Sequence, residues 1–381
     1  MKTSIWTYPW DMAEVGPRQV AAEIAETGLE SISLAATYHS FDAVRPRSTG
    51  NRLLTVDTSA AYYPCDPEAF ADGPLVPSRS SLLTGEDWSD CARAARSAGL
   101  GIVAWTLFLH NSYLSGAHPE LAQTTCTGDR LGHHLCPTQP HVRSYACSLA
   151  SDICGSGDVG ILECESLSFG GYGHSHFHPK IGLDLGPGGR FLFSLCFCDA
   201  CEREATAARI DIQAVRSRAL AQIERVFKSG LPIEASPEEL IDADPDLQSF
   251  ARFRDDTVTT LIREVVQAAG KPVRILAMGD RHTSALDLNP VAELVDAVEI
   301  LCYTSDRDRI RKMIERAAID TGSPNRVGVG LQAYPPASPS PQTLRTSVQT
   351  VRKAGVDRIS FYNYGIMPKQ NLDWIRQSLN N

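Results

Sequence analysis

The sequence predicts an α/β fold, a (β/α)8 barrel with long loops at its C-terminal face, and three observations support this. Strand-like and helix-like segments alternate along the whole 381-residue chain, as a parallel barrel requires. There are eight strand-like segments, and no Gly-x-Gly-x-x-Gly follows the first of them, which argues against a doubly wound sheet, the main alternative. We therefore expect one barrel domain over residues 1–381. It exceeds the usual length of about 250 residues because its early loops are long.

The eight strands are expected where short runs of apolar, β-branched or aromatic residues occur between turn signals. In chain order they are Ser4–Trp10, Ser31–Tyr38, Gly101–Leu109, Val159–Leu167, Pro272–Met278, Ala297–Tyr303, Arg326–Leu331 and Arg358–Tyr362.

The helices are expected where apolar residues recur at helical spacing between capping signals, such as the Thr84-Gly-Glu-Asp segment. They are 17–26, 84–98, 142–153, 199–229, 246–269, 291–295, 306–318 and 341–354. The long connections that remain include an extended Gly- and His-rich loop after strand four, at about 168–198. Insertions of this kind belong to the functional face of a barrel.

Composition restricts the partners that the protein can have. The formal net charge is −9, which disfavours nucleic acid and anionic membranes as partners. No apolar run is long enough to span a bilayer, and the N-terminus lacks the apolar region of a signal peptide. Eleven cysteines without an export signal favour reduced thiols and a cytoplasmic location over a disulfide framework. We expect no organic cofactor, and a homo-oligomer remains open.

Four cysteines have the spacing of a metal site. Cys196, Cys198 and Cys201 form a Cys-x-Cys-x-x-Cys segment, and Cys136 precedes them. Four sulfurs complete a tetrahedral zinc shell, which would be structural because it leaves no open position. The alternative is that these are unpaired cysteines buried as small apolar residues.

This segment resembles the zinc-bearing β-galactosidases of glycoside hydrolase family 42. In that family a Cys-Pro-x-x-Pro-x-x-Arg segment, a strand ending in Asn-Glu and a Cys-x-Cys-x-x-Cys follow one another. Here the same order is Cys136 to Arg143, then Glu165, then Cys196 to Cys201, although Cys164 replaces the asparagine. Over about residues 130–205 the resemblance implies that Glu165 holds the general-acid position and that the four cysteines form a structural site.

The carboxyl ends of barrel strands form the active-site mouth, and here they carry aromatic, amide and imidazole groups. Such groups suit a small carbohydrate, because sugar rings have flat apolar faces and their hydroxyls need hydrogen-bond partners. The expected substrate-binding residues are Tyr8, Trp10, His39, His110, Asn111, Tyr303, Gln332, Tyr334, Tyr362 and Asn363.

Three carboxylates are candidates for catalysis of glycosidic cleavage, which needs a proton donor and a second carboxylate. Glu165 is the expected donor, and Asp280 is the expected second group. Glu163 lies two residues before Glu165, so we expect it one layer deeper, where its charge would raise the pKa of Glu165. Alternatively, Glu163 pairs with a buried base, and Asp280 caps a helix or pairs with Arg281. Strand seven ends in Gln332 rather than the nucleophilic glutamate of the resembled family, so a simple retaining mechanism is in doubt.

The loop after strand four carries a second cluster, with His174, His176 and His178 at alternate positions. In an extended segment these imidazoles would share one face and could bind a metal or the substrate, or the loop could be inert. Three functions therefore remain open: a glycosidase, a metal-dependent sugar lyase or isomerase, and a carbohydrate-binding pseudoenzyme.

Overall fold

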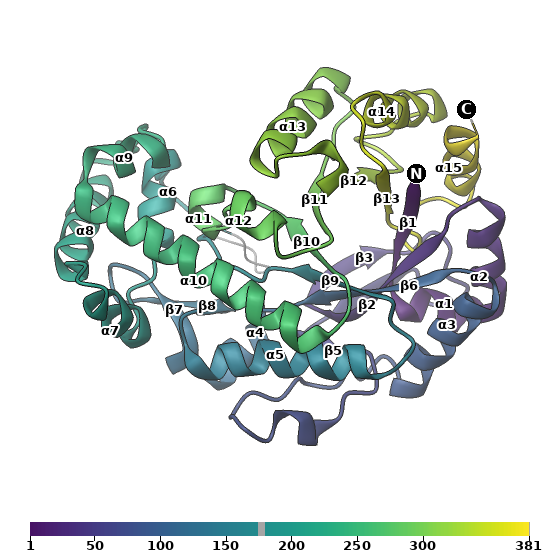
Figure 1. Cartoon of the computed structure of the whole chain (residues 1–381), viewed down its shortest axis with the longest axis horizontal. Coiled ribbons are helices and arrows are strands. Elements are labelled where there is room, and N and C mark those ends of the chain that lie inside the picture. Colours follow the sequence, from purple (N-terminus) through teal and green to yellow (C-terminus); the bar gives the residue numbers. More distant parts are fainter. Residues whose placement is uncertain (174–179, 381) are drawn as a thin grey trace.

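The computed structural model describes residues 1–173 and 180–380 and confirms the (β/α)8 barrel (Figure 1). Its eight strands run parallel, and β1 pairs with both β2 and β13, which closes the sheet on itself. The strands are β1 (Lys2–Thr7), β2 (Ser31–Tyr38), β6 (Gly101–Leu107), β9 (Ile161–Glu165), β10 (Val273–Ala277), β11 (Ala297–Leu301), β12 (Val327–Gln332) and β13 (Arg358–Tyr362).

Five strands, β1, β6, β9, β10 and β11, are shorter than the sequence predicts, and the local backbone explains the ends of β1 and β9. β1 ends at Thr7 because Pro9 occupies the first turn of helix α1 (Pro9–Val15), where its fixed φ and missing N–H are tolerated. Trp10 is therefore helical. β9 ends at Glu165 because Ser166 adopts a φ of 54°, outside the extended region.

The remaining helices lie around the barrel and in its loops. They are α2 (Pro17–Glu26), α3 (Gly85–Ser97), α4 (Ser112–Ala117), α5 (Pro140–Gly155), α6 (Gly186–Ser194), α7 (Asp199–Ala207), α8 (Ile212–Ser229), α9 (Pro237–Ala243), α10 (Pro245–Ala269), α11 (Arg281–Ser284), α12 (Leu288–Ala292), α13 (Arg307–Asp320), α14 (Pro341–Lys353) and α15 (Asn371–Leu379). None of those described combines the length and apolarity needed to cross a bilayer.

The expected helix at 199–229 is two helices. Arg209 adopts a φ of 61°, which interrupts α7, and the Asp211 side chain then accepts a hydrogen bond from Ala214 N and caps α8. In Figure 1, α6, α7, α8 and α9 gather at the left, away from the barrel strands, and the long α10 runs back toward them.

Helix α6 forms inside the stretch predicted to be a loop. Its first turn is Gly-Pro-Gly-Gly, a composition that indicates a loop. These glycines allow close packing, because a Cβ at Gly186 would lie 2.4 Å from the carbonyl oxygen of Ile233, and one at Gly188 would lie 2.5 Å from that of Ala235. Packing thus overrides the local composition.

Two hairpins extend the loops that follow β2 and β6. The first pairs β3 (Phe41–Val44) with β4 (Leu53–Val56), and the second pairs β7 (Ala122–Thr124) with β8 (Arg130–Leu135). A two-residue strand, β5 (Ala60–Ala61), pairs antiparallel with the end of β2. Because both hairpins follow the carboxyl end of a barrel strand, they bring extra side chains to the mouth.

Candidate active site and metal centre

Glu165 lies at the carboxyl end of β9 and is only 5% exposed. The indole Nε1 of Trp105, on the neighbouring β6, donates a hydrogen bond of 2.6 Å to Glu165 Oε2. Burial raises the pKa of Glu165 to about 7, although the Trp105 hydrogen bond acts in the opposite direction. Glu165 can therefore hold a proton near neutral pH, as a general acid must.

Five aromatic side chains surround Glu165 and form what we call the aromatic cluster: Tyr8, Tyr38, Trp105, Tyr303 and Tyr362. Three of them lie on barrel strands, whereas Tyr8 and Tyr303 follow the ends of β1 and β11. The ring centroid of Trp105 lies 4.5 Å from that of Tyr38 and 5.2 Å from that of Tyr8, and the Tyr303 and Tyr362 centroids are 5.6 Å apart. The Glu165 charge helps to raise the pKa of Tyr38, Tyr303 and Tyr362. The aromatic cluster thus offers flat apolar faces and protonated hydroxyls.

Two side chains of the mouth were missed by the sequence analysis. Trp105 lies inside a strand, two residues before Leu107, so the two side chains share one face of the strand. Because Leu107 pairs with Glu165, that face is the one that carries Glu165. Phe41 stacks on Tyr8 with centroids 5.1 Å apart. It comes from the β3–β4 hairpin, for which the sequence carries no clear signal.

The predicted substrate-binding residues fall into two groups: side chains that lie among the aromatic residues of the mouth, and amides that bond the backbone. The rings of Tyr8 and Trp10 stack with centroids 4.7 Å apart. Burial raises the pKa of the half-buried Tyr334, and the nearby Gln332 side chain acts in the opposite direction. By contrast, the Asn111 side chain caps α4 by accepting a hydrogen bond from Leu114 N. The buried Asn363 side chain accepts one from Gly365 N. These two amides therefore serve the backbone in this structure, rather than facing a substrate.

Four histidines gather beside the mouth. The imidazole of His110 stacks on those of His39 and His134, with centroids 4.9 and 5.8 Å apart, and lies 5.5 Å from that of His133. The β7–β8 hairpin supplies His133 and His134, which the sequence analysis did not place there. His174 and His176, the other two histidines of the predicted substrate site, lie outside the described residues.

Glu163 lies one layer below Glu165, as predicted, and is fully buried. The indole Nε1 of Trp6 donates a 2.6 Å hydrogen bond to Glu163 Oε2. Burial and the nearby Glu299 raise the pKa of Glu163 to about 8, against the opposing effect of Arg274. Glu299, on β11, is equally buried and was missed by the sequence analysis. Glu163 has no exposed surface in this structure, and its catalytic role stays a prediction.

The expected electrostatic link between the two glutamates needs a correction. Burial, rather than repulsion from Glu163, raises the pKa of Glu165. The repulsion appears on the other partner, because the charge of Glu165 is among the factors that raise the pKa of Glu163.

Asp280 is the N-cap of helix α11, and its Oδ1 accepts a 2.8 Å hydrogen bond from Thr283 N. Its side chain is exposed, whereas Glu165 is buried, and Asp280 does not contribute to the pKa of Glu165. The capping alternative accounts for this placement, and the structure gives no contact that supports Asp280 as the second catalytic carboxylate.

The four predicted cysteines lie together and are all buried. Cys136 Sγ is 3.6 Å from Cys201 Sγ, 3.7 Å from Cys196 Sγ and 3.6 Å from Cys198 Sγ. A tetrahedral zinc ion with Zn–S bonds of about 2.3 Å requires S···S distances of about 3.8 Å. The donor set and its spacing therefore fit a metal ion, and four thiolates close the shell.

The surroundings of the cysteines also suit a charged cluster. Thr124 N and Gln139 Nε2 point at Cys196 Sγ and Cys198 Sγ, at 3.4 and 3.7 Å. The guanidinium of Arg254 is buried near the cluster. Burial lowers its pKa, and the charges of the cysteines act in the opposite direction and raise it. Such outer contacts orient thiolates and offset their negative charge.

Comparison with solved structures identifies a barrel architecture shared with glycoside hydrolases. The glycoside hydrolase domain of PgaB (BpsB) from Bordetella bronchiseptica is 14% identical, with a TM-score of 0.62 over 99% of this chain and 98% of that chain. A β-galactosidase from Halorubrum lacusprofundi is 15% identical, with a TM-score of 0.62, and one from the psychrophilic Marinomonas ef1 is 12% identical, with a TM-score of 0.59. Both β-galactosidases match 100% of this chain, but the chain spans only 58% and 59% of their lengths.

At these identities the likeness shows the fold alone. No family model and no curated protein matches the chain. The similar structures therefore support the (β/α)8 barrel, and they do not place the chain in glycoside hydrolase family 42.

Proposed function

We propose that the protein is a glycosidase that cleaves a glycosidic bond of a small carbohydrate or glycoconjugate, with Glu165 as general acid. The observation that carries the proposal is the environment of Glu165. It lies at the carboxyl end of a barrel strand, inside a ring of aromatic side chains, and its pKa is about 7. A carboxylic acid that keeps its proton near neutral pH can protonate the leaving oxygen of a glycoside.

The second half of the reaction differs from that of a retaining enzyme with a strand-seven nucleophile. β12 ends in Gln332, and an amide does not form a covalent glycosyl ester. The proposal therefore has no covalent intermediate at this position. It leaves attack by water or by a group of the substrate itself.

Replacement of Glu165 by Gln tests the role of the acid. The change preserves shape but removes the transferable proton, so turnover of a glycoside with an alkyl leaving group should fall by at least about 100-fold. A 2,4-dinitrophenyl glycoside needs little protonation, so its turnover should fall much less. Equal losses on both substrates, or no loss on either, would contradict the assignment.

A carbohydrate-binding protein without turnover is the second candidate, and it is favoured by a specific observation. Gln332 stands at the end of β12, and the carboxylate of Asp280 caps a helix, so no second carboxylate has been assigned. Calorimetry with mono- and disaccharides, combined with overnight product analysis, separates the candidates. Saturable binding without product supports this second function. The metal-dependent lyase or isomerase rests on His174, His176 and His178, outside the described residues, and no observation favours it.

We further propose that the metal of the cysteine cluster is zinc and that its role is structural. A closed thiolate shell holds the loop before α5 against the start of α7 and leaves no coordination position for substrate.

A further inference from the structure

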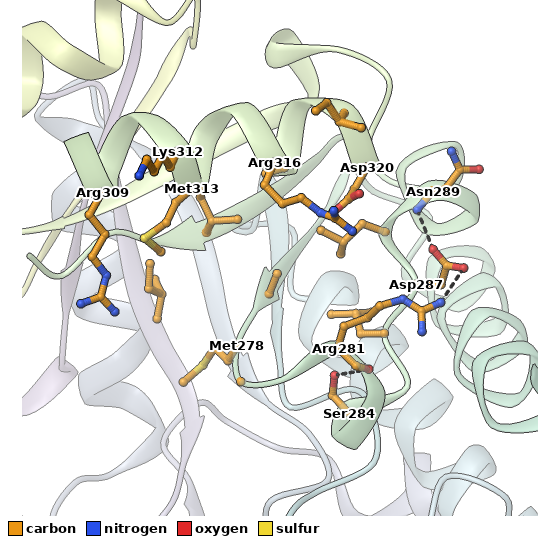
Figure 2. A pocket seen from close by; sticks show the side chains of 18 residues that line it. Met278, Arg281, Ser284, Asp287, Asn289, Arg309, Lys312, Met313, Arg316 and Asp320 are labelled. Atoms are coloured by element: carbon orange, nitrogen blue, oxygen red, sulfur yellow. Dashed lines mark hydrogen bonds and ion pairs between the residues drawn. The ribbon is translucent and has the colours of Figure 1, made fainter. Parts of the chain in front are cut away.

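A cavity of about 780 Å³ lies outside the aromatic cluster, between helix α13 on one side and the α11–α12 segment on the other (Figure 2). Its floor is formed by the ends of β10 and β11, including Ala277 and Ile300. None of its lining residues belongs to the aromatic cluster around Glu165. Its volume is in the range of small-molecule sites, roughly 300–1,000 Å³.

The cavity exists because little helix covers this part of the barrel. The connection from β10 to β11 contains only α11, with four residues, and α12, with five. The neighbouring connection contains α13, with fourteen residues. Met278 and Ile319 line the cavity and are 38% and 73% exposed, which places two large apolar side chains in contact with water. Exposed apolar surface in a hollow is typical of a binding site.

The cavity is positively charged although the chain carries a net charge of −9. Four basic residues line it, against two acidic ones. Arg281 pairs with Asp287, and Arg316 pairs with Asp320.

The other two basic residues, Arg309 and Lys312, have no ion-pair partner within residues 1–173 and 180–380. Figure 2 shows both of them on α13, at the same end of the cavity as Met313. An apolar floor with two cations at one end is complementary to an amphipathic anion.

We propose that this cavity binds a small organic anion with an apolar body, a carboxylate or a phosphate ester. Arg309 and Lys312 hold the anionic group, and Met278, Ile300 and Met313 contact the apolar body. The site is separate from the proposed catalytic site, so the proposal stands whether or not the protein is a glycosidase.

Isothermal titration calorimetry with decanoate and decyl phosphate, below their micelle-forming concentrations, tests this directly. We expect saturable 1:1 binding of at least one of the two, and inorganic phosphate alone should bind at least about tenfold more weakly because it lacks the apolar body. The uncharged 1-decanol should also bind at least about tenfold more weakly than decanoate. Comparing decanoate with decyl phosphate identifies which anionic group is preferred.

Two sets of variants locate the site. The double variant Arg309→Ala/Lys312→Ala should weaken binding at least about tenfold. The matched control Arg307→Ala/Arg311→Ala removes the same charge from the same helix, and neither residue lines the cavity, so it should leave binding within about twofold. Met278→Trp fills the cavity from an exposed position that does not endanger folding, and it should also weaken binding at least about tenfold.

Three outcomes would overturn the proposal. The first is no saturable binding of either amphiphile at millimolar concentration. The second is an equal loss of binding in the control double variant, which would indicate general attraction to the helix. The third is unchanged binding in Met278→Trp, which would place the ligand elsewhere.

Discussion

Individual residues of the mouth show how burial, more than neighbouring charge, prepares the proposed chemistry. Glu165 and Glu163 lie on the same face of β9, each accepting a hydrogen bond from an indole. Both have a raised pKa, about 7 for Glu165 and about 8 for Glu163, and in both the largest cause is loss of water. Both side chains therefore favour the protonated form in the folded protein.

The pH dependence of activity should follow Glu165. Because a general acid works only while protonated, turnover should decline as pH rises through about 7. The rate profile of the wild type between pH 5 and pH 9 measures this limb. The Glu165→Gln variant has no proton to lose, so its residual rate should lack the limb. A limb that persists in the variant would assign the titration to another group.

The Asp280→Asn variant separates capping from catalysis. Asparagine caps a helix about as well as aspartate, so the fold is kept while the carboxylate is removed. Because Asp280 is exposed and bonded to Thr283 N, we expect turnover within about twofold of the wild type, against the loss of at least about 100-fold for Glu165→Gln. A comparable loss in both variants would restore Asp280 as a catalytic group.

Protein stability should also depend on pH through Glu163. Its folded pKa, about 8, lies above the unfolded value near 4.5, so the folded state binds the proton more tightly. Stability is therefore greatest below about pH 4.5 for this group and is lost as pH rises toward 8, with each unit of pKa worth about 1.4 kcal/mol. Denaturant unfolding at pH 5 and pH 8.5 should show a smaller pH-dependent change for Glu163→Gln than for the wild type. An identical change in both would exclude Glu163 as the source.

At the scale of elements, the cysteine cluster joins parts of the chain that lie about 60 residues apart. Cys136 precedes α5, Cys198 is the N-cap of α7 and Cys201 lies in its first turn. The four cysteines therefore lie where the insertion that contains α6 to α9 meets the chain just before the barrel helix α5. Local composition did not predict α6, because its Gly-Pro-Gly-Gly start is stabilised by close packing against 233–235.

The Cys198→Ser variant tests the structural role of this cluster. Removing one thiolate should lower zinc content measured by plasma emission and lower the melting temperature together, by at least about 5 °C. Cys147→Ser is the matched control, because Cys147 lies on α5 outside the cluster and is half-buried. We expect it to leave both quantities unchanged. Wild-type protein purified without any metal, yet equally stable, would remove the proposed role of zinc.

At the scale of the whole molecule, the barrel could be predicted because its signals are local and repeated. β2 and β13 match the predicted bounds, since short apolar runs between turn residues indicate strands whatever lies around them. The place of Glu165 at the end of a barrel strand and the set of four cysteines were also accessible, because each depends on order along the chain.

The rest of the mouth depends on contacts that sequence order does not encode. Phe41 and His134 reach it on short hairpins, and Glu299 lies near Glu163 because β11 and β9 flank β10 in the sheet. For Asp280 the sequence signal was ambiguous, because a carboxylate near a strand end indicates a catalytic group and a helix cap equally well.

The hydrogen bond from Trp105 to Glu165 gives the protein a built-in optical reporter. The indole nitrogen lies 2.6 Å from a carboxylate oxygen, so the loss of a single proton places a full negative charge beside the chromophore. The near-ultraviolet circular dichroism and fluorescence of Trp105 should therefore change as pH passes through about 7, and Trp105→Phe and Glu165→Gln should each abolish that change. Such a titration follows the proposed acid without any sugar present, before a substrate is known.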